Sequence, residues 1–174
     1  MKYIICDLDG TLFNLDHRLD MLARCRNEDD YDRFHQRHID DTVNRKVLNI
    51  LYSYHNLADM ECDSFRTIFI TGRHRKFRSS TVKQIEDLGF VLCKRVREFS
   101  TPLFVFDLYM KPSYKLYTPD YVKRTVKRII ARYGSDNCCF VLDDRPSTIK
   151  VYRDLGLLCL QVKNSTGFLE DVRR

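Results

Sequence analysis

The chain has 174 residues, of which 44% are hydrophobic and 31% are charged, and its formal net charge is +6. These values are typical of a folded domain with a core of its own, and they exclude a chain that is disordered throughout. No apolar run approaches the roughly 18 residues that span a bilayer, and the apolar start of the chain already ends at Asp7. We therefore expect neither a membrane span nor a signal peptide, and a cytoplasmic protein (in the host cytoplasm if it is viral).

Taken in chain order, short β-branched and aromatic runs alternate with helical patterns. The runs that favour strands are Lys2–Cys6, Phe65–Ile70, Leu103–Phe106, Cys138–Leu142 and Leu157–Val162. The patterns that favour helices are Thr42–Tyr54, Ser80–Leu88, Pro119 to Gly134 and Ser147–Leu155. Such alternation predicts an α/β fold, a mostly parallel Rossmann-like sheet sandwiched by helices.

Residues 14–41 interrupt this alternation. They hold two amphipathic, highly charged stretches, Asp16–Arg24 and Asp29–Ile39. We predict that residues 1–174 form a single domain and that residues 14–41 are a small helical cap inserted over its site. An ordinary pair of surface helices is the alternative.

Polar residues follow three of the predicted strands. They are Asp7-Leu8-Asp9-Gly10-Thr11, Thr71-Gly72-Arg73 and Asp143-Asp144-Arg145. Ligands bind at the carboxyl ends of the strands in sheets of this kind. The economical interpretation is therefore one site built from all three segments.

The first of these segments offers two carboxylates for catalysis. Side chains two residues apart in a strand point the same way, so Asp7 and Asp9 can converge on one substrate. One carboxylate can attack phosphorus to give an aspartyl-phosphate, while the other protonates the leaving oxygen and later deprotonates water. A lone DxD also occurs in calcium loops and glycosyltransferases, but the apolar strand before it and Gly10-Thr11 after it favour the catalytic interpretation.

Adjacent carboxylates at Asp143 and Asp144 indicate a cation, because crowded carboxylates repel each other unless one binds. Magnesium prefers a few carboxylates together with phosphate oxygens and water. We predict that Asp7, Asp9 (through its backbone carbonyl), Asp143 and Asp144 hold Mg²⁺. The alternative is an exposed turn that Arg145 neutralises.

The segment Thr71-Gly72-Arg73 favours phosphate binding. A hydroxyl and a backbone amide at a strand-to-helix turn can hold phosphoryl oxygens, and an arginine can grip them bidentately. Thr-Gly-Arg is a common turn sequence, so its position after a strand carries this interpretation.

The three segments together resemble the haloacid dehalogenase (HAD) superfamily of phosphatases. Asp7–Thr11 is similar to its DxDGT signature, Phe69–Arg73 to its second motif and Asp143-Asp144 to its fourth. The resemblance covers nearly the whole chain. It implies an α/β sandwich of HAD type and a Mg²⁺-dependent phosphomonoester hydrolase with Asp7 as nucleophile and Asp9 as general acid and base.

A narrower resemblance is to the 3′-phosphatase domain of bacteriophage polynucleotide kinase. It is carried by Leu108–Lys111, Asp120–Lys123, Val141–Arg145, Val151–Gly156 and Leu160–Val162. It implies that Lys123 is the lysine that balances the charge on the phosphoaspartate, with Lys115 as a competitor. Lys111 stands where related domains usually place Arg, and together with Arg145 it is expected to bind substrate.

The kinase part of such proteins has no counterpart here, because the chain lacks a P-loop of the form GxxxxGK[ST]. We expect a phosphatase acting on a phosphorylated nucleic-acid end, with a polynucleotide 3′-phosphate as the leading substrate. A nucleotide or other small-molecule phosphatase is the alternative, and a non-catalytic nucleic-acid-binding scaffold is a remote one. No obligate protein partner is evident. Basic clusters at residues 73–78, 94–97 and 123–132 suit an anionic substrate.

Overall fold

A computed structural model describes residues 1–60, 64–93 and 104–163. Its centre is a six-stranded sheet in the order β5-β6-β4-β1-β7-β8, and every neighbouring pair is parallel. The strands are β1 (Lys2–Cys6), β4 (Phe65–His74), β5 (Phe90–Leu92), β6 (Phe104–Lys111), β7 (Cys138–Asp143) and β8 (Cys159–Gln161). The predicted α/β fold with a parallel sheet is confirmed.

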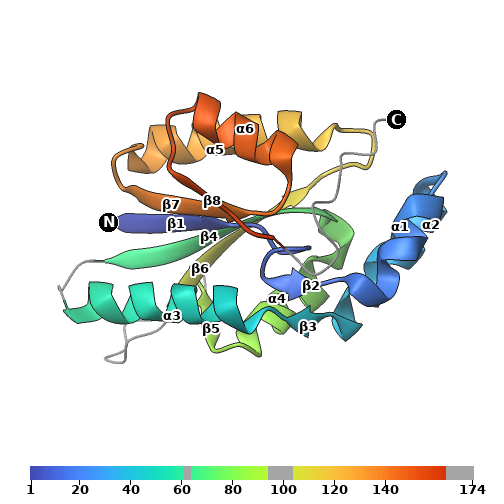
Figure 1. Ribbon diagram of the computed structural model, residues 1–174, viewed down its shortest axis with the longest axis horizontal. Helices are drawn as coiled ribbons and strands as arrows, with labels where there is room; N and C mark the ends of the chain where they lie inside the picture. The colour runs from blue at the N-terminus through green and yellow to red at the C-terminus, as the bar shows by residue number, and fades with distance from the viewer. Residues whose placement is uncertain (61–63, 94–103, 164–174) are drawn as a thin grey trace.

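Helices cover both faces of the sheet. Helices α3 (Arg45–Met60) and α4 (Arg78–Glu86) lie on one face, and α5 (Thr118–Tyr133) and α6 (Pro146–Asp154) lie on the other (Figure 1). The side chains of β1 alternate between the two cores. Ile4 and Cys6 join the cluster that includes α3 and α4, and Tyr3 and Ile5 join the cluster that includes α5 and α6. Burial of β1 on both faces explains its continuous apolar run.

The insert is tied to the sheet by a two-stranded antiparallel ribbon. Strand β2 (Phe13–Asn14) pairs with β3 (Thr42–Val43), so the chain leaves and re-enters the domain at one place. Between them lie η1 (Asp16–Arg18), α1 (Leu19–Arg24), α2 (Glu28–Gln36) and η2 (Arg37–Asp40). Helix α2 begins at a capping box made by Asn27 and Asp30, and the insert has a small core of Leu15, Cys25 and Phe34. The expected helical stretches are therefore present.

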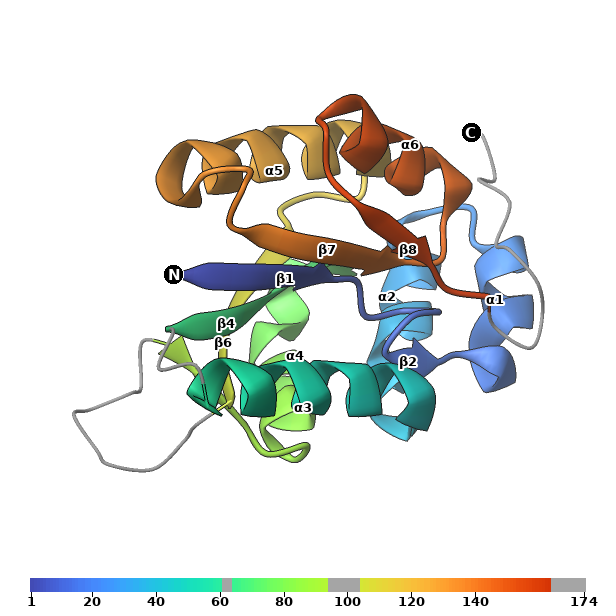
Figure 2. The ribbon, with the colours of Figure 1, turned by 60° about the vertical axis from the view of Figure 1, so that its left-hand side comes forward.

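Helices α1 and α2 lie beyond the carboxyl ends of the strands (Figures 1 and 2). Tyr114, in the β6–α5 connection, stacks on Tyr31 and on His35 at centroid distances of 5.3 and 5.6 Å. Its hydroxyl donates a 2.6 Å hydrogen bond to Asp32, which also pairs with Lys76. These contacts hold the insert over the end of the sheet where the polar segments meet.

The predicted boundaries differ from the observed ones at the strand ends. Strand β4 continues beyond Ile70 to His74, so Thr71-Gly72-Arg73 lies inside the strand, where a register shift against β6 occurs. Strand β8 is shorter than predicted, and β2, β3 and β5 were not predicted because runs of two or three residues give no periodic signal. The basic residues 94–97 lie outside the described residues. No helix in the described parts of the chain is long and apolar enough to cross a membrane.

Candidate active site

Three carboxylates meet at the carboxyl ends of two neighbouring strands. Asp7 follows β1, Asp143 ends β7, and Asp144 comes next. Because β1 and β7 are parallel and paired, these ends lie side by side. One oxygen of each carboxylate lies within 4.8 Å of the others, and the residues are 8%, 2% and 0% exposed, respectively. We call these three residues the acidic cluster.

The electrostatics of the acidic cluster favour a bound cation. Burial, with Asp143 and Asp144 nearby, raises the pKa of Asp7 well above its usual range. Burial also raises the pKa of Asp144 to about 7, against the opposing effect of Arg145. Asp7 Oδ2 and Asp144 Oδ2 are buried and have no hydrogen-bond partner among the residues that the structure describes. Buried carboxylate oxygens that lack a donor are suited to bind a hard cation such as Mg²⁺, so these residues fit the predicted metal.

Asp143 is positioned differently from its two neighbours. Its Oδ1 accepts hydrogen bonds from the backbone N–H of Arg145 at 2.9 Å and from the hydroxyl of Thr148 at 2.6 Å. Thr148 lies in the first turn of α6, so the start of that helix fixes the carboxylate. Of the three, Asp143 is therefore held most firmly by the protein itself.

Position 10 requires glycine because the backbone there lies close to the acidic cluster. Its φ is +91°, and a β-carbon at this position would overlap the carboxylate of Asp144. The next residue, Thr11, donates a hydrogen bond of 3.4 Å to Asp144 Oδ1. The Gly-Thr pair after the two aspartates thus packs the β1 loop against β7.

Asp9 lies in a buried network of two carboxylates and two arginines. Its Oδ1 accepts hydrogen bonds from Arg18 Nη2 at 2.6 Å and from Arg73 Nη2 at 2.8 Å. Asp41 binds the same arginines, at 2.5 and 2.7 Å from Arg18 and 3.3 Å from Arg73. Both arginines are 0% exposed. We call these four residues the ionic network.

The ionic network keeps Asp9 ionised. Burial alone would raise the pKa of this carboxyl, but the Arg73 and Arg18 guanidiniums hold it well below its usual range. Asp9 therefore carries no proton in this arrangement.

Arg73 takes a different role from the expected one. Its guanidinium donates to Asp9, Asp41, Thr81 and Gln84, which are all protein groups. The residue predicted to grip the phosphoryl group is thus directed at Asp9, because two buried carboxylates attract it more strongly than open solvent does. Release of at least one of these contacts must precede any contact with phosphate.

Thr71 and Gly72 lie in the last part of β4, near the carboxyl end of the sheet, and not after the strand as predicted. Thr71 is 1% exposed, and its hydroxyl accepts a hydrogen bond of 3.2 Å from the N–H of Arg73. A β-carbon at Gly72 would meet no atom within 4 Å, so the chain is open there. An oxyanion can approach this stretch of backbone.

Lys111 and Arg145 are the two further cations predicted to bind substrate, and Arg145 interacts with the acidic cluster. Lys111 ends β6, is 9% exposed and donates a 3.2 Å hydrogen bond to Thr118 at the start of α5. Burial, and repulsion from Arg145, lower its pKa to about 8. Burial disfavours the charge of Arg145, but Asp144, Asp7 and Asp143 raise its pKa above the ordinary value. Arg145 therefore lies within electrostatic reach of the acidic cluster, and Lys111 lies within electrostatic reach of Arg145.

The two candidates for the charge-balancing lysine, Lys123 and Lys115, have exposed side chains. Lys123 is exposed in the second turn of α5, and Lys115 is exposed in the connection before it. Within residues 104–163, neither side chain makes an ion pair with an acidic group of the site.

Sequence reasoning missed Arg18, Asp41, His35 and His38. Arg18 and Asp41 stand near the two ends of the insert and meet only because β2 pairs with β3. His35 in α2 and His38 in η2 are buried side chains of the insert itself, and burial lowers their pKa values to about 3 and about 4. No local pattern marks these residues among the many charges of residues 14–41.

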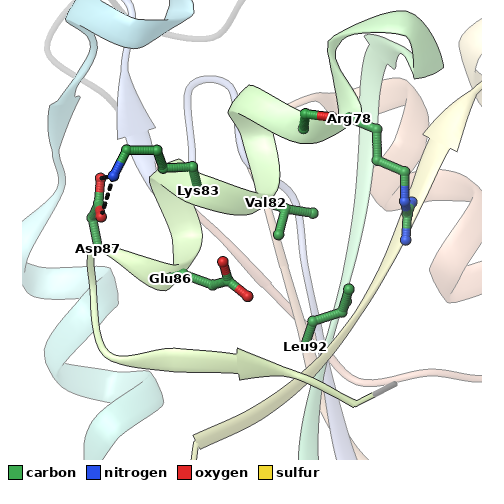
Figure 3. Close-up of a pocket in the computed structure, with 7 residues that line it drawn as sticks. Arg78, Val82, Lys83, Glu86, Asp87 and Leu92 are labelled. Atoms are coloured by element: carbon green, nitrogen blue, oxygen red, sulfur yellow. Dashed lines mark hydrogen bonds and ion pairs between the residues drawn. The ribbon is translucent and has the colours of Figure 1, made fainter. Parts of the chain in front are cut away.

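A pocket of about 420 Å³ between α4 and β5 is separate from this site. Its lining includes Arg78, Val82, Lys83, Asp87 and Leu92, none of which belongs to the acidic cluster or the ionic network. Lys83 and Asp87 pair at its edge (Figure 3), and the Arg78 guanidinium donates to the backbone oxygen of Leu108. The pocket shows no group poised for chemistry.

Comparison with known proteins identifies the class of this site. The sequence model of the family described as the polynucleotide kinase PNKP phosphatase domain matches residues 1–166. The chain belongs to this family and is a HAD-type phosphatase. A search of curated protein sequences found no match.

Solved structures share the fold. A chain of the Pnkp1/Rnl/Hen1 RNA repair complex is 21% identical with a TM-score of 0.55; the alignment covers 93% of this chain and 42% of that one. This protein thus spans less than half the length of that relative. A HAD-like hydrolase from Streptococcus pneumoniae is 12% identical with a TM-score of 0.56, over 98% and 88% of the two chains. A HAD enzyme from Bacteroides thetaiotaomicron, crystallised with magnesium and inorganic phosphate, is 14% identical with a TM-score of 0.53, over the full length of both.

Proposed function

We propose that this protein is a Mg²⁺-dependent polynucleotide 3′-phosphatase that acts through a phosphorylated Asp7. The observation that carries the proposal is the acidic cluster, in which a buried Asp7 has an oxygen without a partner beside Asp143 and Asp144. Membership of the PNKP phosphatase-domain family supports a nucleic-acid end as the substrate.

In the proposed reaction, an oxygen of Asp7 attacks phosphorus while the bond from phosphorus to the leaving oxygen breaks. The leaving oxygen takes a proton from Asp9. Water then attacks the phosphorus of the aspartyl-phosphate as its bond to the Asp7 oxygen breaks, and gives a proton back to Asp9. This frees inorganic phosphate and restores Asp7 as a carboxylate and Asp9 as a protonated carboxyl. Bound Mg²⁺ would neutralise charge on the phosphoryl group and on the carboxylates around it.

The ionic network sets a condition on the first step. Asp9 is ionised while both arginines hold it, and an ionised carboxylate cannot donate a proton. The general-acid role therefore requires that substrate binding loosen Arg73 or Arg18. Asp9→Asn should then slow substrates with poor leaving groups much more than aryl phosphates, and an equal loss on both would contradict the role.

The cations around the site are proposed to stabilise the transition state. Thr71, Gly72 and Arg145 are suited to hold phosphoryl oxygens, and Lys111 supplies a buried positive charge at the end of β6. Lys123 remains the residue that the family resemblance favours for balancing charge on Asp7. We propose that residues 14–41 act as the cap, since Arg18 binds Asp9 directly and Asp41 binds Arg73, which also binds Asp9.

A substrate panel tests this proposal. Phosphate release is measured from 3′-phosphorylated oligonucleotides, 5′-phosphorylated oligonucleotides, mononucleotides and sugar phosphates, each with Mg²⁺ and with EDTA. We expect 3′-phosphorylated oligonucleotides to give the highest kcat/KM, and only with Mg²⁺. Equal or faster turnover of mononucleotides would replace the proposal with a nucleotidase.

A further inference from the structure

The exposed face of α5 carries an unusual concentration of positive charge. Its five basic residues, which are all exposed, are Lys123, Arg124, Lys127, Arg128 and Arg132. The helix holds one carboxylate, Asp120, so its net charge is +4 in 16 residues, whereas the whole chain carries +6. The opposite side of the helix packs on the sheet through Val122, Val126 and Ile129. We call the five cations the α5 basic face.

These cations differ from three basic residues on other helices of the protein. Arg33 pairs with Asp30, Lys83 with Asp87 and Lys150 with Asp154, each at helical spacing. On α5, by contrast, no ion pair joins the basic face to a carboxylate within the described parts of the chain. Lys123 and Lys127, Arg124 and Arg128, and Arg128 and Arg132 are each four residues apart.

Like charges at that spacing destabilise a helix by about 0.2–0.5 kcal/mol per pair. The α5 basic face is therefore unfavourable for the isolated protein. A polyanion laid along it would remove that repulsion, which a single small anion could do only locally.

Helix α5 starts close to Lys111 at the carboxyl end of β6, and the α5 basic face follows from the second turn onward. Lys111, the last residue of β6 and within electrostatic reach of Arg145, donates a hydrogen bond to Thr118, the first residue of α5. At the far end, the carbonyl oxygen of Gly134 accepts a hydrogen bond from Tyr3 near the start of β1. The helix thus runs from the carboxyl edge of the sheet to its amino edge (Figure 2). From Lys123 to Arg132 the face extends about 14 Å at 1.5 Å per residue, enough for several phosphates.

An exposed aromatic ring stands where the face begins. Tyr117 precedes α5 and is 51% exposed. Other aromatic residues near the basic clusters are engaged within the protein: Tyr114 stacks on Tyr31 and His35, and Phe77 packs on His35 and His38. An aromatic platform next to a row of cations is the usual arrangement for holding a single strand without sequence preference.

We propose that a single-stranded nucleic acid lies along the α5 basic face, with a base on Tyr117 and its backbone on Lys127 and Arg128. This inference rests on the proposed function, because it places the body of the strand whose phosphorylated end enters the site. Single-stranded DNA and RNA share the chemistry that this face would recognise, a flexible polyanion with bases that can stack. The face therefore sets substrate length preference, whereas the acidic cluster performs the reaction.

The test compares Lys127→Gln/Arg128→Gln with Lys46→Gln/Lys83→Gln, a control that removes two exposed cations from the helices on the other side of the sheet. The kcat/KM is measured for a nucleoside 3′-phosphate and for 3′-phosphorylated oligonucleotides of increasing length, over a range of salt concentrations. We expect the α5 variant to match wild type on the nucleoside 3′-phosphate and to lose several-fold on long oligonucleotides. Its slope of log kcat/KM against log salt should be shallower by about 1.4, since each single-strand phosphate contact contributes about 0.7.

A second variant separates stacking from charge. Tyr117→Ser should raise KM for oligonucleotides about tenfold, the loss of one stacked base, and leave the salt slope unchanged. Equal behaviour of the α5 variant and its control, or an equal loss on the nucleoside 3′-phosphate, would overturn the inference and leave the proposed function standing.

Binding of an unphosphorylated oligonucleotide, measured by fluorescence anisotropy, distinguishes failure of the proposed function from failure of this inference. If wild type hydrolyses only small phosphomonoesters but binds this oligonucleotide through α5, the substrate assignment fails and the inference stands. Absence of binding overturns the inference. Binding to phosphatidylserine vesicles in place of the oligonucleotide also overturns it, in favour of a membrane surface.

Discussion

Replacing Arg18 with methionine probes the connection between the insert and Asp9. Arg18 is 0% exposed, and its guanidinium bridges Asp9 and Asp41 at 2.5 to 2.7 Å while lying 4.3 Å from the centre of the Phe34 ring. Methionine keeps much of the apolar stem but leaves two buried carboxylates with Arg73 alone. Removing one partner of a buried ion pair costs about 3–5 kcal/mol, so we expect the free energy of unfolding to fall by that amount.

Urea denaturation at pH 7, followed by circular dichroism, measures the effect. Arg37→Met is the matched control, because Arg37 pairs with Asp40 on the surface of the same insert, at 56% and 50% side-chain exposure, and should cost less than about 1 kcal/mol. Adding Asp41→Asn to Arg18→Met should recover part of the loss, since it removes one stranded charge. An Arg18→Met variant as stable as Arg37→Met would refute the description of the ionic network.

Other predictions concern metal and pH. EDTA should abolish activity and Mg²⁺ restore it, and Asp144→Asn should weaken Mg²⁺ dependence or abolish turnover; full activity without metal would show that the acidic cluster is misassigned. Burial lowers the pKa values of His35, His38 and His55 to about 3, 4 and 4, below the unfolded value of about 6.5. The folded protein then binds fewer protons, so its free energy of unfolding should fall as pH drops from about 6.5 towards 4; a flat profile would contradict this. Lys111 should lose its charge near pH 8, so activity should decline above that pH, and Lys111→Met should lack this decline.

The sheet was predictable from sequence because its strands are buried on both faces. Runs such as Lys2–Cys6 are continuously apolar, and the polar residues that follow them mark the carboxyl edge. The acidic cluster was predictable for the same reason. Asp7 and Asp143 are fixed to adjacent strand ends, so strand order alone brings them together.

The partners of Asp9 were not predictable in this way. Arg18 and Asp41 are 23 residues apart and reach Asp9 only through the path of the insert, which has no periodic signal strong enough to define it. Arg73 follows from its strand position, but its orientation depends on that same insert. The sequence therefore predicts the residues at the strand ends, whereas the ion pairs that these residues make depend on the path of the insert.

The central claim is that Asp7 becomes phosphorylated during turnover. The direct measurement is rapid acid quenching of the enzyme with Mg²⁺ and a fast aryl phosphate substrate, followed by mass spectrometry of the peptide that contains Asp7. We predict a phosphoryl group on Asp7 at early times, none on any other residue, and none in an Asp7→Asn variant, which should be inactive but folded. Steady turnover with no phosphoryl group on Asp7 at any quench time, or near-wild-type activity of Asp7→Asn, would contradict the account.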